Sequence, residues 1–255
     1  MRIFWNGKTA MNANQEKLDV ISNNLANMNT NGYKKLEIKF SDLMSETYNK
    51  LGYPINSEDT FTGTGVKSTE ALRDITQGGL TETSLKTDLA IDGSGFFRVD
   101  KPDGTTAYTR NGSFILDSLG RLTDGEGNLL FISFNEGYSY NNVEFSSDNI
   151  VVNNSGSIAI KRGEEYQEIG NIPLYSPLGS NSLYSIGESL FIATEDTQMI
   201  MGGDADILQG YIETSNVDMG EELTDMIITQ RAYQFGAKIV ETADEMWAMI
   251  NNLRR

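Results

Sequence analysis

The two ends of this chain carry helical patterns, and the long stretch between them does not. Apolar side chains recur at spacings of three and four over residues 4–28 and again over residues 223–253. The intervening residues alternate short β-type runs with Gly-rich turns. This order predicts an α+β fold that is mainly β, with a terminal helix on each side of a β-rich middle.

Both helical segments have the seven-residue repeat of coiled-coil seams. We take the repeat positions as a candidate assembly interface. In the first segment these residues are Phe4, Met11, Leu18, Ile21, Leu25 and Met28. In the last segment the main seam is Ile228, Ala232, Phe235, Ile239, Met246, Met249 and Leu253, and a second stripe holds Met226, Tyr233, Val240 and Trp247. Two stripes make the last helix apolar over more of its circumference than one partner covers, so it is expected to have several neighbours.

Three arrangements can cover these seams: a hairpin within one chain, a simple dimer, or a polymer of many copies. The first segment is rich in asparagine, which competes for backbone hydrogen bonds, and it contains Gly7, which weakens a helix further. A helix of this kind gains its stability from packing. This weakness and the double stripe favour assembly over the other two arrangements.

Local signals suggest where the helices end. Asp218 stands three residues before Glu221, the spacing of a capping box, so the last helix is predicted to begin there. Asn31-Gly32 is a plausible stop for the first helix, with Gly32 in the left-handed conformation.

The middle of the chain is predicted to be an antiparallel β-sandwich or partial barrel. Turn signals such as Pro102-Asp103-Gly104 and Asn111-Gly112 separate short candidate strands, among them 89–91, 96–99, 129–134 and 150–152. The resulting division is an N-terminal axial helix over 1–35, a polar connector over 36–61, a β-rich domain over 62–215 and a C-terminal axial helix over 216–255.

Composition argues against catalysis. The chain has no cysteine and no histidine, which removes thiolate nucleophiles, His-based triads and Cys/His zinc sites. The glycines of Gly63-Thr64-Gly65 and Gly93-Ser94-Gly95 open no helix and precede no Gly-Lys-Ser/Thr, so they are interpreted as turns and not as phosphate cradles. The calcium-loop pattern that starts at Asp124 has Leu129 where glycine is required. We therefore expect no enzyme, and no catalytic, cofactor-binding or metal-binding residues.

Charge and hydropathy limit the partners. The formal net charge is −16, and residues 1–39 hold six Lys/Arg against three Asp/Glu, which leaves 14 against 33 for the remainder. A body this acidic repels a phosphate backbone, so no nucleic-acid partner is expected. The longest aliphatic or aromatic run, 129–132, is far too short for membrane insertion, and the N-terminus lacks the apolar run of a secretory signal.

Several long motifs resemble those of the bacterial flagellar rod and hook proteins. The matching segments are 18–27 (LDVISNNLAN) and 29–34 (NTNGYK), 89–97 (LAIDGSGFF) and 108–114 (YTRNGSF), and 209–218 (QGYIETSNVD), 230–233 (QRAY) and 242–246 (TADEM). They span nearly the whole chain in the order and at the spacing of that family. Segments 63–66 and 77–80 look most like its distal rod branch, while proximal rod and hook-like paralogues share many of the same motifs.

The resemblance implies a structural subunit of the flagellar basal body. Such proteins leave the cell through the flagellar type III export apparatus without a cleaved signal, and they polymerise with themselves and with other rod and hook proteins. Their terminal helices, weakly ordered in monomers, form the inner layer of a torque-transmitting tube, and the β domain faces outwards. A rival hypothesis, drawn from the residues alone, is a secreted carbohydrate-binding or carbohydrate-active protein that uses pairs such as Glu164-Glu165 and dimerises through its helices.

Overall fold

The computed structural model describes residues 2–43, 45–47, 61–63, 65–140, 142–163, 165–178, 183–187, 189–194, 197–202 and 205–253. It contains two helices and a mainly antiparallel set of strands, which confirms the predicted fold class. The chain divides into two compact units. The helical unit comprises Met1–Ala26, Leu36–Asp74 and Asp218–Arg255, and the β unit comprises Asn27–Lys35 and Ile75–Val217.

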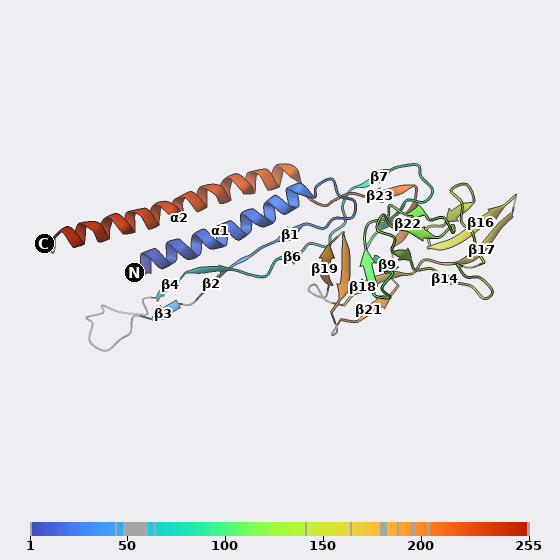
Figure 1. The fold of residues 1–255 in the computed structure, drawn as a ribbon, viewed down its shortest axis with the longest axis horizontal. Helices are drawn as coiled ribbons and strands as arrows, with labels where there is room; N and C mark the ends of the chain where they lie inside the picture. The colour runs from blue at the N-terminus through green and yellow to red at the C-terminus, as the bar shows by residue number, and fades with distance from the viewer. Residues whose placement is uncertain are drawn as a thin grey trace. The chain divides into compact units, whose positions relative to one another are not determined.

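The helical unit is built on α1 (Arg2–Ala26) and α2 (Met219–Leu253), which lie side by side and antiparallel (Figure 1). The start of α2 is as expected, because Asp218 Oδ1 accepts hydrogen bonds from the backbone N–H groups of Gly220 (2.7 Å) and Glu221 (3.0 Å). The end of α1 differs from the prediction. The helix stops at Ala26, and turns fill the residues up to Gly32, which has the expected left-handed conformation with a φ of 66°.

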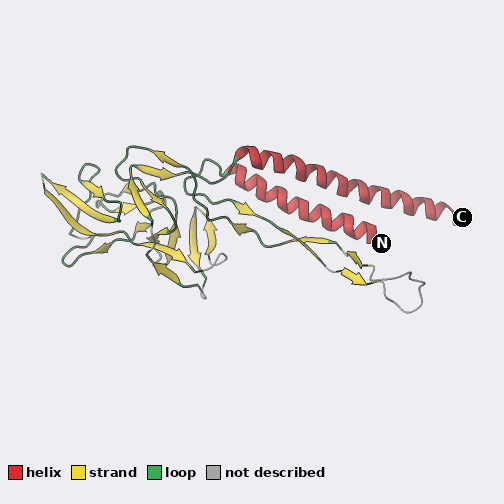
Figure 2. Ribbon diagram, turned by 180° about the vertical axis from the view of Figure 1, so that it is seen from behind, coloured by secondary structure: helices red, strands yellow, loops and turns green. Residues whose placement is uncertain are grey.

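A two-stranded antiparallel ribbon completes the helical unit (Figure 2). Its outgoing strands are β1 (Leu36–Glu37), β2 (Phe40–Asp42) and β3 (Ser45–Thr47), and they pair in turn with β6 (Leu72–Arg73), β5 (Val66–Ser68) and β4 (Phe61–Gly63). The sequence pattern predicts no strand over 36–47, because polar residues dominate it and the ribbon has little core to mark one face. Residues 48–60 of the predicted connector lie outside the described residues.

The β unit contains two larger sheets and two strand pairs, all antiparallel. The nine-stranded sheet holds β9 (Phe96–Asp100), β10 (Thr106–Thr109), β11 (Ile115–Leu116), β12 (Leu122–Thr123), β13 (Leu129–Leu130), β18 (Leu174–Pro177), β19 (Leu183–Gly187), β20 (Leu190–Ala193) and β21 (Met199–Met201). The four-stranded sheet holds β14 (Ser133–Phe134), β15 (Ile150–Val152), β16 (Ser157–Arg162) and β17 (Glu165–Asn171). The pairs are β7 (Leu80–Glu82) with β23 (Tyr211–Glu213) and β8 (Leu89–Asp92) with β22 (Asp206–Gln209). The described strands form no closed barrel.

The strand expected over 129–134 divides between the two larger sheets. Its first part, β13, pairs with β9, and its second part, β14, pairs with β17. Between them Phe131 donates its backbone N–H to the carbonyl of Arg98 at 2.9 Å. Leu130 and Ile132 are both buried. A single straight strand would also place these two side chains on the same face, so the burial pattern alone does not reveal the change of sheet.

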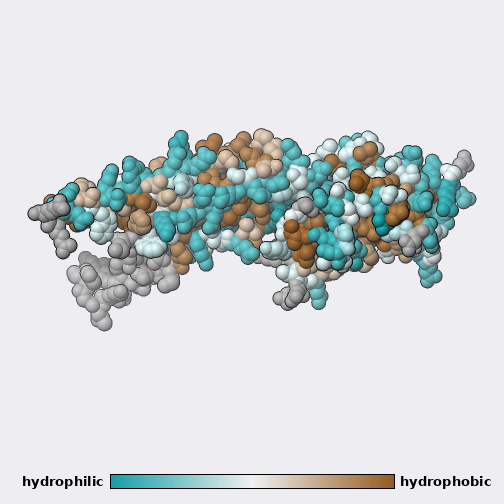
Figure 3. Space-filling view, in the orientation of Figure 1, coloured by the Kyte–Doolittle hydropathy of each residue, from teal (hydrophilic) through white to brown (hydrophobic). Residues whose placement is uncertain are grey.

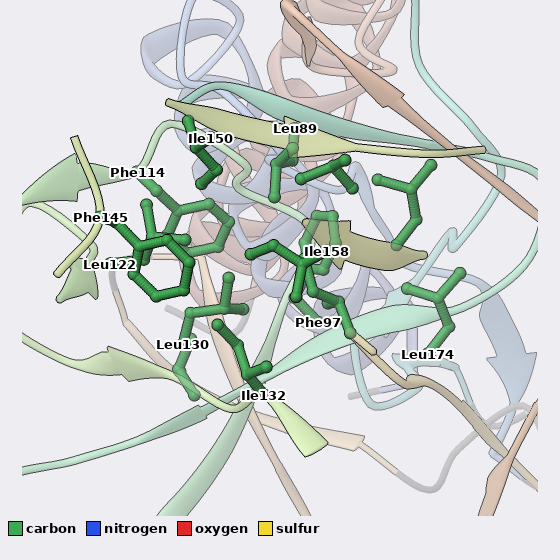
Figure 4. Close-up of a cluster of buried hydrophobic side chains, with 14 of the residues drawn as sticks. Leu89, Phe97, Phe114, Leu122, Leu130, Ile132, Phe145, Ile150, Ile158 and Leu174 are labelled. Atoms are coloured by element: carbon green, nitrogen blue, oxygen red, sulfur yellow. The ribbon is translucent and has the colours of Figure 1, made fainter. Parts of the chain in front are cut away.

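The core of the β unit draws side chains from both larger sheets and from the β8–β22 pair (Figure 4). Phe97 and Phe114 meet edge to face with ring centroids 5.6 Å apart, and Leu89, Ile150 and Ile158 pack into the same cluster. Because these residues come from distant parts of the sequence, the cluster joins the sheets into one unit.

Removing the Phe97 ring should therefore destabilise the whole β unit. We expect Phe97→Ala to lower its free energy of unfolding by about 3–5 kcal/mol, through lost burial and the cavity left behind. Leu119→Ala, at a side chain that is 61% exposed, should change it by less than about 0.5 kcal/mol. Urea unfolding followed by tyrosine circular dichroism suits this test, because both tryptophans, Trp5 and Trp247, lie in the helices. Equal effects of the two variants would contradict this account of the core.

Candidate assembly interface

The contact between α1 and α2 is made by small residues. A Cβ added at Gly7 would lie 2.9 Å from Val240 Cγ2, and one added at Gly236 would lie 2.9 Å from Met11 Cγ. The buried positions of α2 recur every seven residues and are Glu222, Thr229, Gly236 and Ala243. Two helices meeting at glycine approach more closely than larger side chains allow, so this contact is specific in register.

A buried polar cluster fixes the base of the helix pair. Asn24, at 1% exposure, uses its side-chain amide as a peptide group would. Its Nδ2 donates to the carbonyl of Leu36, and its Oδ1 accepts from the Leu36 N–H, both at 2.9 Å. The same Nδ2 lies 3.2 Å from Glu222 Oε2 on α2. One residue thus joins α1, α2 and the first strand of the ribbon, which sets their register.

The ribbon covers a second side of α1. Gly65 has a φ of 131°, and a Cβ there would lie 2.6 Å from Thr9 Oγ1 on α1. Farther along, the Ser68 hydroxyl donates to the carboxylate of Glu16. On the other side of α1, Lys17 forms an ion pair with Asp225 of α2 at 2.9 Å. Helix α1 is therefore flanked by two elements of its own chain.

The structure places the predicted residues of the first segment in different surroundings. Ile21 is buried, Met11, Leu18 and Leu25 are half-buried, and Phe4 is 46% exposed. Met28 is half-buried in the turn that follows α1, and it belongs to the β unit.

The two stripes predicted on α2 separate. Ala232, Tyr233, Val240 and Met226 are half-buried, and Val240 lies against Gly7. The large side chains of the main seam are exposed in the single chain: Ile228, Phe235, Ile239, Met246, Met249 and Leu253, together with Trp247 of the second stripe. Phe235 is 71% exposed. Figure 3 shows hydrophobic side chains at the surface of the helical unit. We call these seven residues the open face of α2.

The C-terminal part of α2 extends past α1. Gly7 lies beside Gly236 and Val240, and Ala243 is the last buried residue of α2. From Met246 onward every described side chain of α2 is exposed. Part of the open face therefore has no helix of its own chain beside it.

Sequence reasoning missed two groups of interface residues. Ile227 and Ile250 are also large, apolar and exposed, and an unweighted count of apolar residues on α2 finds them. Gly7, Gly236, Thr229 and Asn24 form the contact within the chain. A search for large apolar side chains passes over these residues, because they are small or polar.

Other kinds of site find no support among the described residues. No cluster of three or more acidic, histidine or cysteine side chains there could hold a metal ion. Neither described helix has a stretch long and apolar enough to cross a membrane.

Three family models match the chain along its length. They are described as flagella basal body rod protein (residues 5–34), flagellar hook protein FlgE/F/G D1 domain (90–160) and flagellar basal body rod FlgEFG protein C-terminal (208–253). The first and last matches contain α1 and α2 almost entirely. By these matches the chain is similar to flagellar rod and hook proteins over its two terminal helical segments and over part of the β-rich domain between them.

Full-length relatives narrow the class. The flagellar basal-body rod protein FlgG of Borreliella burgdorferi is 38% identical over 100% of this chain and 99% of its own. The proteins of that name from Buchnera aphidicola (strain APS) and Bacillus subtilis are 36% and 34% identical, over 98% and 100% of both chains respectively. The chain belongs to the flagellar basal-body rod protein family, and the predicted resemblance is confirmed. The family is structural and not enzymatic.

The close contact at glycine makes a specific prediction. Gly236→Leu should separate α1 from α2, because the new side chain would occupy the space of Met11 and the Gly7 backbone. Since the chain has no cysteine, spin labels at Lys17→Cys and Asp225→Cys report on the pair without interference. Pulsed electron paramagnetic resonance should give a short, narrow label distance that becomes long and broad in Gly236→Leu. Gln234→Leu adds the same side chain at an exposed position and should leave the distance unchanged. An unchanged distance in Gly236→Leu would contradict this description of the contact.

Proposed function

We propose that this chain is a structural subunit of the distal part of the flagellar rod and that it polymerises through its terminal helices into a torque-transmitting tube. The observation that carries the proposal is the open face of α2. Within the chain, α1 and α2 approach most closely at Gly7 and Gly236, and most of the large apolar side chains of α2 remain exposed. The whole-length relationship to rod proteins named FlgG supplies the context in which other copies would cover that face.

Burial of the open face would supply a substantial driving force. Full burial of one Phe, Ile or Met side chain stabilises an assembly by about 1.5–3 kcal/mol. Several such residues on one helix, repeated in every subunit, offset the entropy lost when a subunit joins. Acidic and amide side chains such as Gln234 and Glu241 lie between the exposed apolar positions and keep the free chain soluble.

The predicted interface residues of both helices are proposed to contact neighbouring copies and other rod and hook proteins. Phe4 and the open face of α2 are the parts accessible for this in a single chain. We also propose that residues 1–35 and 216–255 form the axial part of each subunit and that 62–215 form the outer domain. Delivery to the growing end would use the flagellar type III export apparatus.

The alternatives have less support. A proximal rod or hook-like paralogue would share the motifs and the fold, but the full-length relatives at 34–38% identity carry the name FlgG. None of the relatives named above is described as carbohydrate-active, and Glu164 of the pair Glu164-Glu165 lies outside the described residues.

Electron microscopy of basal bodies from a strain deleted for this gene tests the function directly. We expect a rod that stops short and carries no hook, and the length of the remaining rod separates a distal role from a proximal one. Intact basal bodies with hooks would overturn the proposal.

Charge on the open face should block assembly without unfolding the subunit. We expect Phe235→Asp and Met246→Asp to abolish swimming when they replace the wild-type gene, because a carboxylate would be buried between copies without a partner. Gln234→Asp places the same charge one position from Phe235 on the same helix and should retain near-normal swimming. Export of each variant, measured in the culture medium, separates assembly from secretion. Normal rods built from Phe235→Asp subunits would refute the assignment of this face.

A further inference from the structure

Glu213, the last residue of β23, is the centre of a buried ionic cluster in the β unit. Its carboxylate is fully buried. Oε1 accepts hydrogen bonds from Lys34 Nζ at 2.6 Å and from the Gly78 N–H at 2.9 Å, and Oε2 accepts from an Arg110 Nη at 2.9 Å. We call Lys34, Arg110 and Glu213 the ionic node.

The two cations of the node are buried as completely as the carboxylate. Lys34 also donates to the carbonyl of Thr76 at 2.6 Å, and Arg110 donates to the carbonyl of Gly93 at 2.7 Å. Burial lowers the pKa of Arg110, and the charge and hydrogen bond of Glu213 oppose that shift. Glu213 forms an ion pair with each of the two cations, so it is the member of the node whose loss removes a partner from both others.

Backbone contacts extend the node to neighbouring segments. The Gly32 N–H donates to the Glu213 carbonyl at 2.8 Å, and the Lys35 N–H donates to Asn216 Oδ1 at 2.7 Å. Asn216 Nδ2 in turn donates to the hydroxyl of Thr76 at 3.1 Å. At Gly78 a Cβ would lie only 2.0 Å from the Thr214 carbonyl oxygen, so the segments are packed backbone to backbone.

These segments are the ones through which the chain passes between its two units. The chain leaves or enters the β unit after Ala26, Lys35, Asp74 and Val217. A residue of the node, or one bonded to it, lies close to each of the last three passages. Lys34 precedes the second passage, Thr76 follows the third, and Glu213 and Asn216 precede the fourth. Gly32 ties the segment that follows the first passage to the same carboxylate-bearing residue. General stability of the β unit does not require such a placement, because its hydrophobic core lies among other residues.

We infer that Lys34, Arg110 and Glu213 are positioning residues that fix the course of the three segments, 30–35, 75–78 and 213–217, by which the chain enters and leaves the β unit. The inference concerns the chain itself and holds whether or not the proposed open face of α2 is correct.

Three of the recognised motifs meet at this node. Lys34 lies in 29–34, Arg110 in 108–114, and Glu213 in 209–218. In the sequence these motifs are separate. In the fold they form one cluster, which gives the three motifs a common physical role.

Hydrogen–deuterium exchange of the purified full-length chain tests the inference. Glu213→Gln should speed exchange at least a hundredfold over 30–35, 75–78 and 213–217, because two buried cations each lose an ion-pair partner. Lys34→Met leaves a balanced Arg110–Glu213 pair and should speed exchange about tenfold, mainly over 30–35 and 75–78. The matched control is Asp124→Asn, which also changes a buried carboxylate of the same unit to an amide. The Asp124 carboxylate accepts hydrogen bonds from Asn128 within its own turn. It should leave all three segments unchanged.

Exchange in the core strands distinguishes a local role of the node from general stabilisation of the β unit. Exchange over β9 and β16 should stay within threefold of the wild type in Glu213→Gln, since those strands are held by the hydrophobic cluster. Uniformly faster exchange across the β unit would show that the node merely stabilises the domain, and would overturn the inference. Unchanged exchange in the connecting segments would overturn it as well. Because the soluble chain is measured, a failure of the rod assignment leaves this result interpretable.

Discussion

The arrangement of the helical unit depends on the close approach of α1 and α2 at Gly7 and Gly236. The contact between the glycines brings the two helix backbones close together with little side-chain volume, and it leaves most of the large apolar side chains of α2 exposed. If large apolar residues filled this contact, the chain would complete its own core and have less to gain from neighbours. The glycines of α2 thus serve the contact within the chain, and its exposed large residues are the ones that we propose to contact other copies.

Polar groups at two places hold the ends of these elements. Asn24 ties the base of α1 to Leu36 and Glu222 within the helical unit, and Glu213 ties the connecting segments within the β unit. Both are buried polar clusters with several hydrogen bonds each, and neither contributes to a hydrophobic core. Such clusters contribute specificity more than net stability, because a shifted register would leave their groups unpaired.

Much of this organisation can be predicted from the sequence, and the exceptions have physical reasons. Heptad periodicity identifies both helices, and an Asp218 cap marks the start of α2, because these signals are local. The ribbon of β1–β6 gives no such signal, since its half-buried positions are not consistently apolar: Ser41 is half-buried while the neighbouring Phe40 is exposed. The switch of 129–134 between sheets depends on which distant strands are adjacent. Among the candidate interface residues, periodicity selects large side chains well. It cannot show that Val240 lies against α1 while Phe235 stays exposed, because that difference depends on Gly7 of the facing helix.

The glycine contact also implies an uneven tolerance to substitution along α2. At Gly236 every replacement adds atoms where Met11 already lies, so few amino acids can be tolerated there, and side-chain volume sets the limit. In the proposed polymer the open face packs against other copies, where residues of similar size and polarity can replace one another with compensating shifts. A lineage can therefore retune the fit between subunits through the open face while the fold of each subunit stays the same.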